Sequence, residues 1–160
     1  MPYFRFASLT ALVVAIFASA QSQPSDQTTI MASAQKSAVR ALNFRQGEVS
    51  SLTRVHGDFT PEGWKDFMKH MEGFLDQNGA PTFNSSFVPS KDPVFLDSRD
   101  GVVHFRILGT LTQSQNQSRT TYRAAIEVYA LRDLLIQGGS AIKIQHLEQI
   151  TCSGASTVCQ

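Results

Sequence analysis

The stretch Phe59-Thr60-Pro61-Glu62-Gly63-Trp64, followed by Phe67, marks the start of the best-defined helix in the chain. Thr60 can cap a helix with its hydroxyl, and Pro61 suits the first helical position, where no amide hydrogen bond is lost. Glu62 then lies at the positive end of the helix dipole. The sequence therefore predicts an amphipathic helix whose buried face carries an apolar stripe at three- and four-residue spacing: Trp64, Phe67, Met68, Met71 and Leu75.

Two further helices are expected before this one. Apolar residues recur at helical spacing from Thr29 to Leu42, in a segment rich in alanine. The segment 43–47 interrupts this pattern, and 48–56 has apolar residues on one side of a second, shorter helix. The segment 21–28 is polar and contains Pro24, so we expect a flexible leader there.

After Pro81 the apolar period changes from helical spacing to alternation, which is typical of strands. Two short pieces, 82–88 and 93–96, are separated by Pro89 and Pro93 and are therefore expected at a sheet edge. Long strands beginning at 101 and 121 flank a polar turn at 114–118 and form an antiparallel hairpin. A last strand, 142–151, loses its alternation near His146, where we expect a β-bulge. Helices followed by such strands predict an α+β fold, with the helices packed on one face of a curved antiparallel sheet.

The opposite face of that sheet is polar. Arg106, Arg123, Glu127 and Tyr129 alternate with the apolar positions of the hairpin strands, so they point away from the core. We expect cross-strand charge pairs here, and we take these four residues as the candidate surface for a partner.

Length and charge limit the classes of function. A chain of 160 residues suits a single domain, which we place at 29–151. The 14 basic and 13 acidic residues provide no positive excess, so nucleic-acid binding is not expected.

The N-terminus resembles a secretory signal peptide. Arg5 precedes a mostly apolar run, and Ala18-Ser19-Ala20 provides the small residues of a cleavage site before Gln21. Removal of residues 1–20 takes away Arg5 and leaves 13 basic and 13 acidic residues, so stable membrane attachment is not expected afterwards. The alternative is an uncleaved inner-membrane anchor, although the apolar run is short for a bilayer span.

The two cysteines, Cys152 and Cys159, both lie near the C-terminus. In an oxidising compartment they most simply form a disulfide that closes a tail at 152–160. A free or intermolecular pair is the alternative, whereas a metal site is disfavoured because the four histidines are widely spaced.

No catalytic, cofactor-binding or metal-binding residue can be assigned from a motif. Polar groups that could serve chemistry in a cone-shaped fold are Asp97, His104, Tyr122, Tyr129 and His146, but spacing pairs none of them. A small cone-fold enzyme or small-ligand binder, with a pocket near His104 and Tyr122, is therefore retained as the alternative function.

One combination of segments points to a particular protein family more specifically than the patterns described above. Ala41-Leu42-Asn43-Phe44, a short helix, and then the stretch 59–64 with Phe67 resemble the DotI/IcmL family of type IVB secretion systems, which is related to the TraM protein of conjugative plasmids. The resemblance extends from about Ile30 to Ile150.

The resemblance implies a nuclear transport factor 2-like fold and a non-catalytic contact module in the periplasm. It also implies structural roles for Phe59, Thr60, Pro61, Glu62, Gly63, Trp64 and Phe67. The expected partners are other secretion-system proteins or further copies of the chain. Members of this family usually carry a cytoplasmic stretch and a transmembrane helix before the domain. A signal-like start therefore leaves accessory and secreted roles open beside that of a core component.

Overall fold

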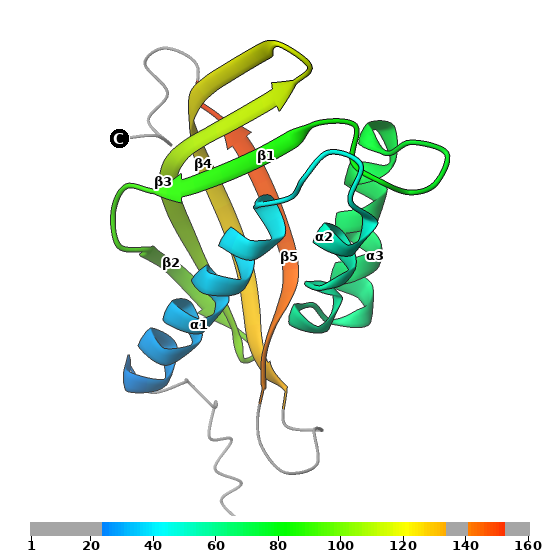
Figure 1. Cartoon of the computed structure of the whole chain (residues 1–160). Helices are drawn as coiled ribbons and strands as arrows, with labels where there is room; N and C mark the ends of the chain where they lie inside the picture. The colour runs from blue at the N-terminus through cyan, green and yellow to red at the C-terminus, as the bar shows by residue number, and fades with distance from the viewer. Residues whose placement is uncertain (1–23, 134–140, 153–160) are drawn as a thin grey trace, which may run out of the picture.

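The computed structural model describes residues 24–133 and 141–152, in which helices come first and an antiparallel sheet follows (Figure 1). The helices are α1 (Pro24–Leu42), α2 (Val49–Thr53) and α3 (Pro61–Met71), with 3-10 turns at His56–Asp58 and Glu72–Phe74. The strands are β1 (Asn84–Pro89), β2 (Val94–Arg99), β3 (Val102–Gln115), β4 (Ser118–Asp133) and β5 (Ala141–Thr151). This element order confirms the expected α+β class.

The sheet runs in the order β1-β3-β4-β5, and β2 pairs with the same edge of β3 as β1 does. β1 is opposite residues 109–114 of β3, and β2 is opposite residues 102–106. The edge strand is thus broken between Pro89 and Val94. The prediction that these proline-flanked pieces are edge strands is confirmed, because proline cannot donate to a central ladder.

The last strand contains the predicted bulge. Tyr129 pairs with His146, but Ala130 pairs with Ile144, so Gln145 is the extra residue in β5. The alternation in the sequence slips at this point because a bulge changes which side chains face the core.

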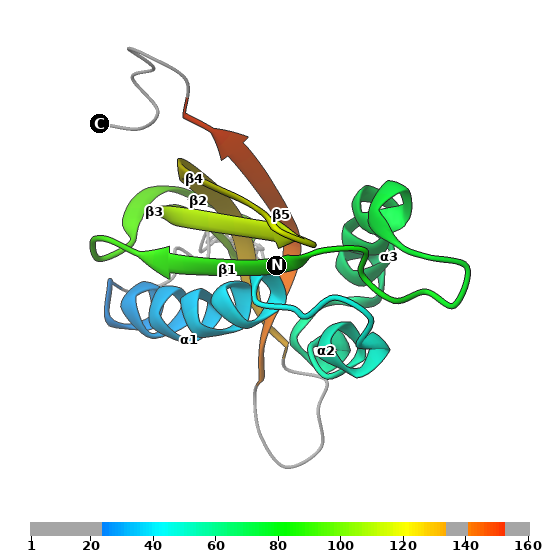
Figure 2. The ribbon, with the colours of Figure 1, turned by 45° about the horizontal axis from the view of Figure 1, so that its top comes forward.

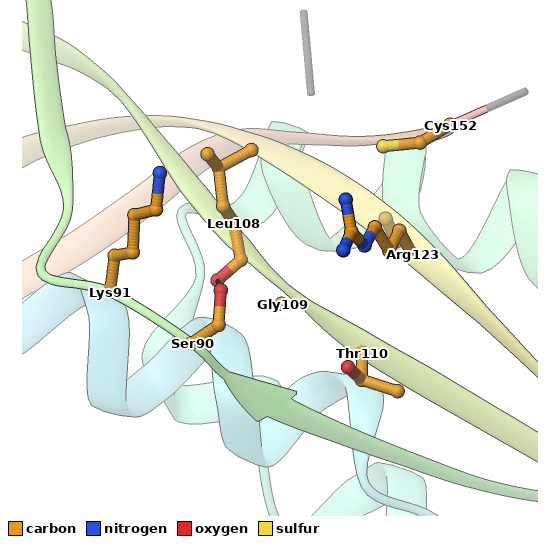
Figure 3. Close-up of a pocket in the computed structure, with 8 residues that line it drawn as sticks. Ser90, Lys91, Leu108, Gly109, Thr110, Arg123 and Cys152 are labelled. Carbon is orange, nitrogen blue, oxygen red and sulfur yellow. Dashed lines mark hydrogen bonds between the residues drawn. The ribbon is translucent and has the colours of Figure 1, made fainter. Parts of the chain in front are cut away.

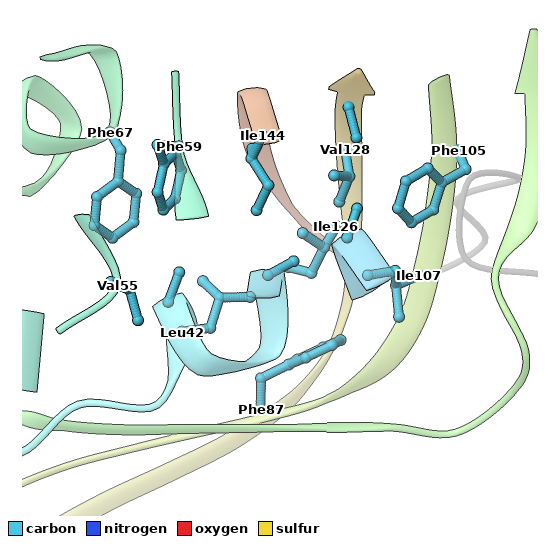
Figure 4. Packing of buried hydrophobic residues seen from close by; sticks show 14 of the residues in the cluster. Leu42, Val55, Phe59, Phe67, Phe87, Phe105, Ile107, Ile126, Val128 and Ile144 are labelled. Carbon is cyan, nitrogen blue, oxygen red and sulfur yellow. The ribbon is translucent and has the colours of Figure 1, made fainter. Parts of the chain in front are cut away.

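Helix α1 packs on one face of the curved sheet, and α3 stands beside the outer strand β5 (Figure 2). α1 contacts β1, β3, β4 and β5, and α3 lies against β5. Small residues of α1 allow close contact with the sheet, and the core between the layers is filled by large side chains (Figure 4), among them Phe87, Phe105, Ile107, Ile126 and Ile144.

Gly109 explains how Phe87 fits into this core. A Cβ atom at Gly109 would lie 2.5 Å from the Phe87 ring and 2.5 Å from the Val88 carbonyl oxygen. The missing side chain therefore makes room for the aromatic ring of the neighbouring edge strand.

The leader prediction for 21–28 is wrong over residues 24–28, because α1 already begins at Pro24. Proline is well suited to the first turn of a helix, and Asp26 lies near the positive end of the dipole. Asp26 also forms an ion pair with Arg132 of β4, a tertiary contact that the local pattern does not reveal.

Several expectations fall on other parts of the chain. The signal peptide at 1–20, the leader residues 21–23 and the tail from 153 to 160 with Cys159 lie outside the described residues. Within the described ranges, no helix combines the length and apolar character that a membrane span requires.

Candidate interaction surface

The stretch 59–64 docks the helical layer onto β5. The Thr60 hydroxyl accepts a hydrogen bond from the Gly63 amide at 3.0 Å, which confirms the predicted helix cap. The Thr60 amide donates to the Ile144 carbonyl at 2.9 Å, next to the bulge. A Cβ atom at Gly63 would lie 2.6 Å from the carbonyl oxygens of both Ile144 and Gln145, so the helix touches the strand backbone directly.

The aromatic residues of the same stretch form a cluster. The rings of Phe59 and Phe67 stack with centroids 5.1 Å apart, and Trp64 meets Phe59 edge-on at 5.8 Å. Trp64 is only partly buried, and its outer side lies against His56 at 4.9 Å. These contacts pack the aromatic rings of the stretch against one another and against His56.

The segment Ala41-Leu42-Asn43-Phe44 attaches the helical layer to β1, at the opposite edge of the sheet. The Asn43 Oδ1 atom accepts a hydrogen bond from the Phe87 amide at 2.7 Å. Phe44 and Ser85 exchange backbone hydrogen bonds of 3.1 and 2.9 Å. The two segments that carry the family resemblance therefore attach the helical layer to β1 and to β5, the two outer strands of the path.

The outward face of the sheet carries a connected polar network. His104 lies between two carboxylates, with Nδ1 3.3 Å from Asp97 Oδ2 and Nε2 3.0 Å from Glu127 Oε2. Arg106 donates from Nε and from a terminal nitrogen to Glu127 Oε1, at 3.1 and 2.6 Å. The expectation of cross-strand charge pairs is confirmed for Arg106 and Glu127, which are directly opposite in the β3–β4 register.

This network sets the charge state of Glu127. Burial raises the pKa of the Glu127 carboxyl, but the hydrogen bonds and positive charges of Arg106 and His104 outweigh burial and leave the pKa below its ordinary value. Glu127 thus remains a charged acceptor, and Arg106 is neutralised within the molecule.

An aromatic ladder extends from this network toward α3. Tyr129 stacks on His104, with ring centroids 4.0 Å apart and planes within 9°, and lies 5.5 Å from His146. The His146 Nδ1 atom is 2.6 Å from Asp66 Oδ2 on α3. Burial raises the pKa of the Tyr129 hydroxyl, and the charges of Glu127, Glu148 and Asp97 add to that effect.

Arg123 lies apart from these residues. It is opposite Thr110, four residues along β4 from Glu127, and lines a separate hollow of about 510 Å³ (Figure 3). The candidate partner surface therefore consists of two regions: a network with Arg106, Glu127 and Tyr129, and a hollow with Arg123. Centring the hairpin turn on Asn116-Gln117 would have revealed this separation, because it fixes the register of both strands.

The prediction of one pocket near both His104 and Tyr122 is wrong, because the two residues do not line the same site. His104 faces outward with Asp97 and Tyr129, whereas Tyr122 alternates with the core residues and is opposite Leu111. Tyr122 lines a different hollow of about 480 Å³, where its hydroxyl accepts a hydrogen bond from Gln149 at 3.2 Å. Side chains on opposite faces of one sheet cannot act on the same ligand atom.

The described residues contain no group of three or more His, Cys, Asp or Glu side chains placed to hold a metal ion. The outer face offers hydrogen bonding, charge and aromatic contact.

Three solved structures have similar folds. The periplasmic domain of DotI matches with a TM-score of 0.64 and 17% identity, over 84% of this chain and 99% of that one. An IcmL-like type IV secretion system protein from Legionella pneumophila matches with a TM-score of 0.61 and 11% identity, over 82% and 97% of the two chains. This chain has the DotI/IcmL fold. CagV, a VirB8 homolog from the type IV secretion system of Helicobacter pylori, matches with a TM-score of 0.56 and 10% identity, over 78% and 99%.

The DotI/IcmL fold confirms the expected nuclear transport factor 2-like architecture. No protein-family model matches the sequence, and no curated protein matches it either. The likeness is therefore one of fold, found where sequence identity is low.

Proposed function

We propose that this protein is a non-catalytic interaction module of the periplasm, acting as a component or accessory of a type IV secretion or conjugation apparatus. The observation that carries the proposal is the shared fold, which spans about four-fifths of this chain and almost the whole of three secretion-system structures. The partners are other proteins of that apparatus or further copies of this chain.

The distribution of polar groups supports a role in contact. Large apolar side chains form the core between the helices and the sheet. Arg106, Arg123, Glu127 and Tyr129 all face outward, and we assign the partner surface to this face. Within it, Arg106 and Glu127 satisfy each other, so Arg123 and the exposed positions around it are the better candidates for direct contact.

Photo-crosslinking in native cells tests this function. A photoreactive amino acid replaces Thr121, which is exposed on the outward face of β4, and Glu62, exposed on the helical layer, is the control position. We expect position 121 to crosslink to another secretion-system protein or to a second copy, and position 62 not to do so. Crosslinks at neither position, in a correctly folded and exported protein, would contradict the proposal.

The ligand-binding alternative has one observation in its favour. A hollow of about 510 Å³ on the outer face is lined in part by His104, Tyr129 and Asp97. A folded His104→Ala variant that keeps its crosslinks but loses binding of a small molecule from a periplasmic extract would support this alternative.

A further inference from the structure

The outer edge of β5 is covered near its start and is not paired near its end. The Thr60 amide donates to the Ile144 carbonyl, and Gly63 lies against the same backbone, so the helical layer covers the edge there. Beyond the bulge, residues 147–151 pair with β4 alone. In Figure 1 the upper part of β5 leans away from α3, so the strand and the helix diverge from their point of contact.

The β4–β5 register shows which backbone groups point outward from this edge. The Cys152 amide donates to the Arg123 carbonyl at 3.1 Å, so these two residues form a hydrogen-bonded pair. In an antiparallel ladder such pairs alternate with pairs whose amides and carbonyls point away from each other. Leu147, Gln149 and Thr151 occupy these alternate positions. Within residues 24–133 and 141–152, no group bonds to their outward amides or carbonyls. An extended segment could therefore pair with this edge.

An apolar hollow of about 350 Å³ lies beside the same edge, between α3 and β5. Phe67 and Met71 line it from α3, and Leu147 lines it from β5. Phe74 also lines the hollow and is 50% exposed. Side chains of an added strand that face the same side of the sheet as Leu147 would enter this hollow and remove apolar surface from water.

The outward face of the sheet indicates the charge of such a segment. Arg106 is opposite Glu127, and Glu127 is opposite Glu148, so the three side chains form one row across β3, β4 and β5. Arg106 neutralises Glu127, whereas Glu148 is exposed and forms no ion pair within the described residues. Like charges directly opposite each other are unfavourable. The next position in this row, on an added strand, therefore favours a basic residue.

We propose that residues 147–151 of β5 bind an extended segment of a partner protein, which adds a strand to the sheet. The segment has a basic residue opposite Glu148, and the apolar residues before and after it point toward the hollow beside α3. A second copy fits less well, because β5 has no lysine or arginine after Lys143 to place opposite Glu148. The biological meaning of the site rests on the proposed interaction function, to which it adds one edge and one kind of partner.

A peptide titration tests the site itself. The probe is a capped peptide, Thr-Ile-Lys-Val-Thr, added at low ionic strength to the isotope-labelled protein while backbone amide shifts are recorded. We expect shifts centred on residues 147–151, with further shifts at Met71 and Phe74. Glu148→Lys should weaken binding by about tenfold or more, because attraction to the peptide lysine becomes repulsion.

Matched controls separate strand addition from general charge effects. Glu62→Lys makes the same change at an exposed position outside the hollow and should leave the affinity within about twofold. The peptide Thr-Ser-Lys-Ser-Thr has the same charge without apolar side chains and should not bind. The original peptide with its three central amides N-methylated cannot donate to the strand edge and should not bind either. Thr-Ile-Glu-Val-Thr should bind Glu148→Lys more tightly than wild type, which would show that the variant is folded.

The outcomes distinguish the two proposals. Absence of shifts at 147–151, equal loss of affinity in Glu62→Lys and Glu148→Lys, or binding of the N-methylated peptide overturns the site, even if crosslinks from position 121 identify a secretion-system partner. Shifts of the same amides when the protein alone is concentrated would assign the edge to a second copy and overturn the partner segment. Specific peptide binding without crosslinks from position 121 supports the site and contradicts the secretion role.

Discussion

Gly63 is the residue at which the helical layer and the sheet come closest. Any side chain there meets the Ile144 and Gln145 carbonyl oxygens, which belong to the strand backbone and cannot rotate away. We therefore expect Gly63→Ala to destabilise the fold by about 1–3 kcal/mol, as overpacked sites do, despite the better helix propensity of alanine. Urea unfolding followed by circular dichroism measures the change.

Gly73→Ala is the matched control. A Cβ atom at Gly73 has no atom within 4 Å outside its immediate neighbours, so the free energy of unfolding should change by about 0.5 kcal/mol or less. Equal losses in the two variants would mean that the contact of Gly63 with β5 is unimportant.

Glu127 gives the fold a predictable acid sensitivity. Its pKa lies below the ordinary 4.5 in the folded chain, so its ion pair contributes fully above that value and is lost as the pH falls through the lowered pKa. Hydrogen bonds to charged groups contribute about 1.5–3 kcal/mol, and Glu127→Gln should lose part of this at neutral pH. The stability gap between wild type and Glu127→Gln should therefore narrow from about pH 6 to about pH 3 in urea unfolding.

Exposed Glu72→Gln provides the comparison for this titration. The stability difference between wild type and Glu127→Gln is expected to change with pH. If it stays constant, or changes in the same way as the difference for Glu72→Gln, the network does not hold Glu127 in its charged form.

Contacts between residues close in the sequence could be predicted, whereas contacts between distant residues could not. The Thr60 cap involves Gly63, three residues away, so the sequence was sufficient to predict it. The contact between Asp66 and His146 joins residues 80 apart, and neither residue has a local signal for the other. The same holds for Gly109, whose meaning depends on the Phe87 ring of another strand.

At the scale of elements, position in the sheet predicts resistance to local opening. β3 and β4 pair on both sides along most of their length, whereas β2 pairs only with β3. We expect backbone amides of β4 to exchange with solvent most slowly and those of β2 to exchange much faster, as hydrogen-exchange mass spectrometry can measure. Comparable protection of β2 and β4 in the isolated protein would show that something covers the β2 edge.

Helices and strands could be predicted where the spacing of apolar residues in the sequence matches the repeat of the backbone. The hairpin, the proline-broken edge and the bulge near His146 each leave a mark on the alternation of apolar residues. The first turn of α1 leaves no such mark, because its polar residues are held by a distant partner such as Arg132. The sequence predicted that the candidate partner residues share one face of the sheet. Their separation into two regions could be seen only from the pairing register of β3 and β4.

At the scale of the whole molecule, the fold is recognisable although sequence identity with the similar structures is low. Identities of 10–17% accompany TM-scores of 0.56–0.64, so similar folds are formed by sequences that differ at most positions. Cores tolerate such exchange when volume and patterning are kept. The backbone contacts that segments 41–44 and 59–64 make with the two outer strands depend less on side-chain identity.

The chain as a whole should be exported, processed and oxidised. The start of the sequence predicts cleavage before Gln21, and an oxidising compartment favours a disulfide between Cys152 and Cys159. In fractionated native cells we expect a periplasmic protein whose intact mass begins at Gln21, with both thiols blocked to alkylation until a reductant is added. A full-length mass in the inner-membrane fraction, with thiols that alkylate without reductant, would contradict both predictions. It would instead make the first segment an anchor.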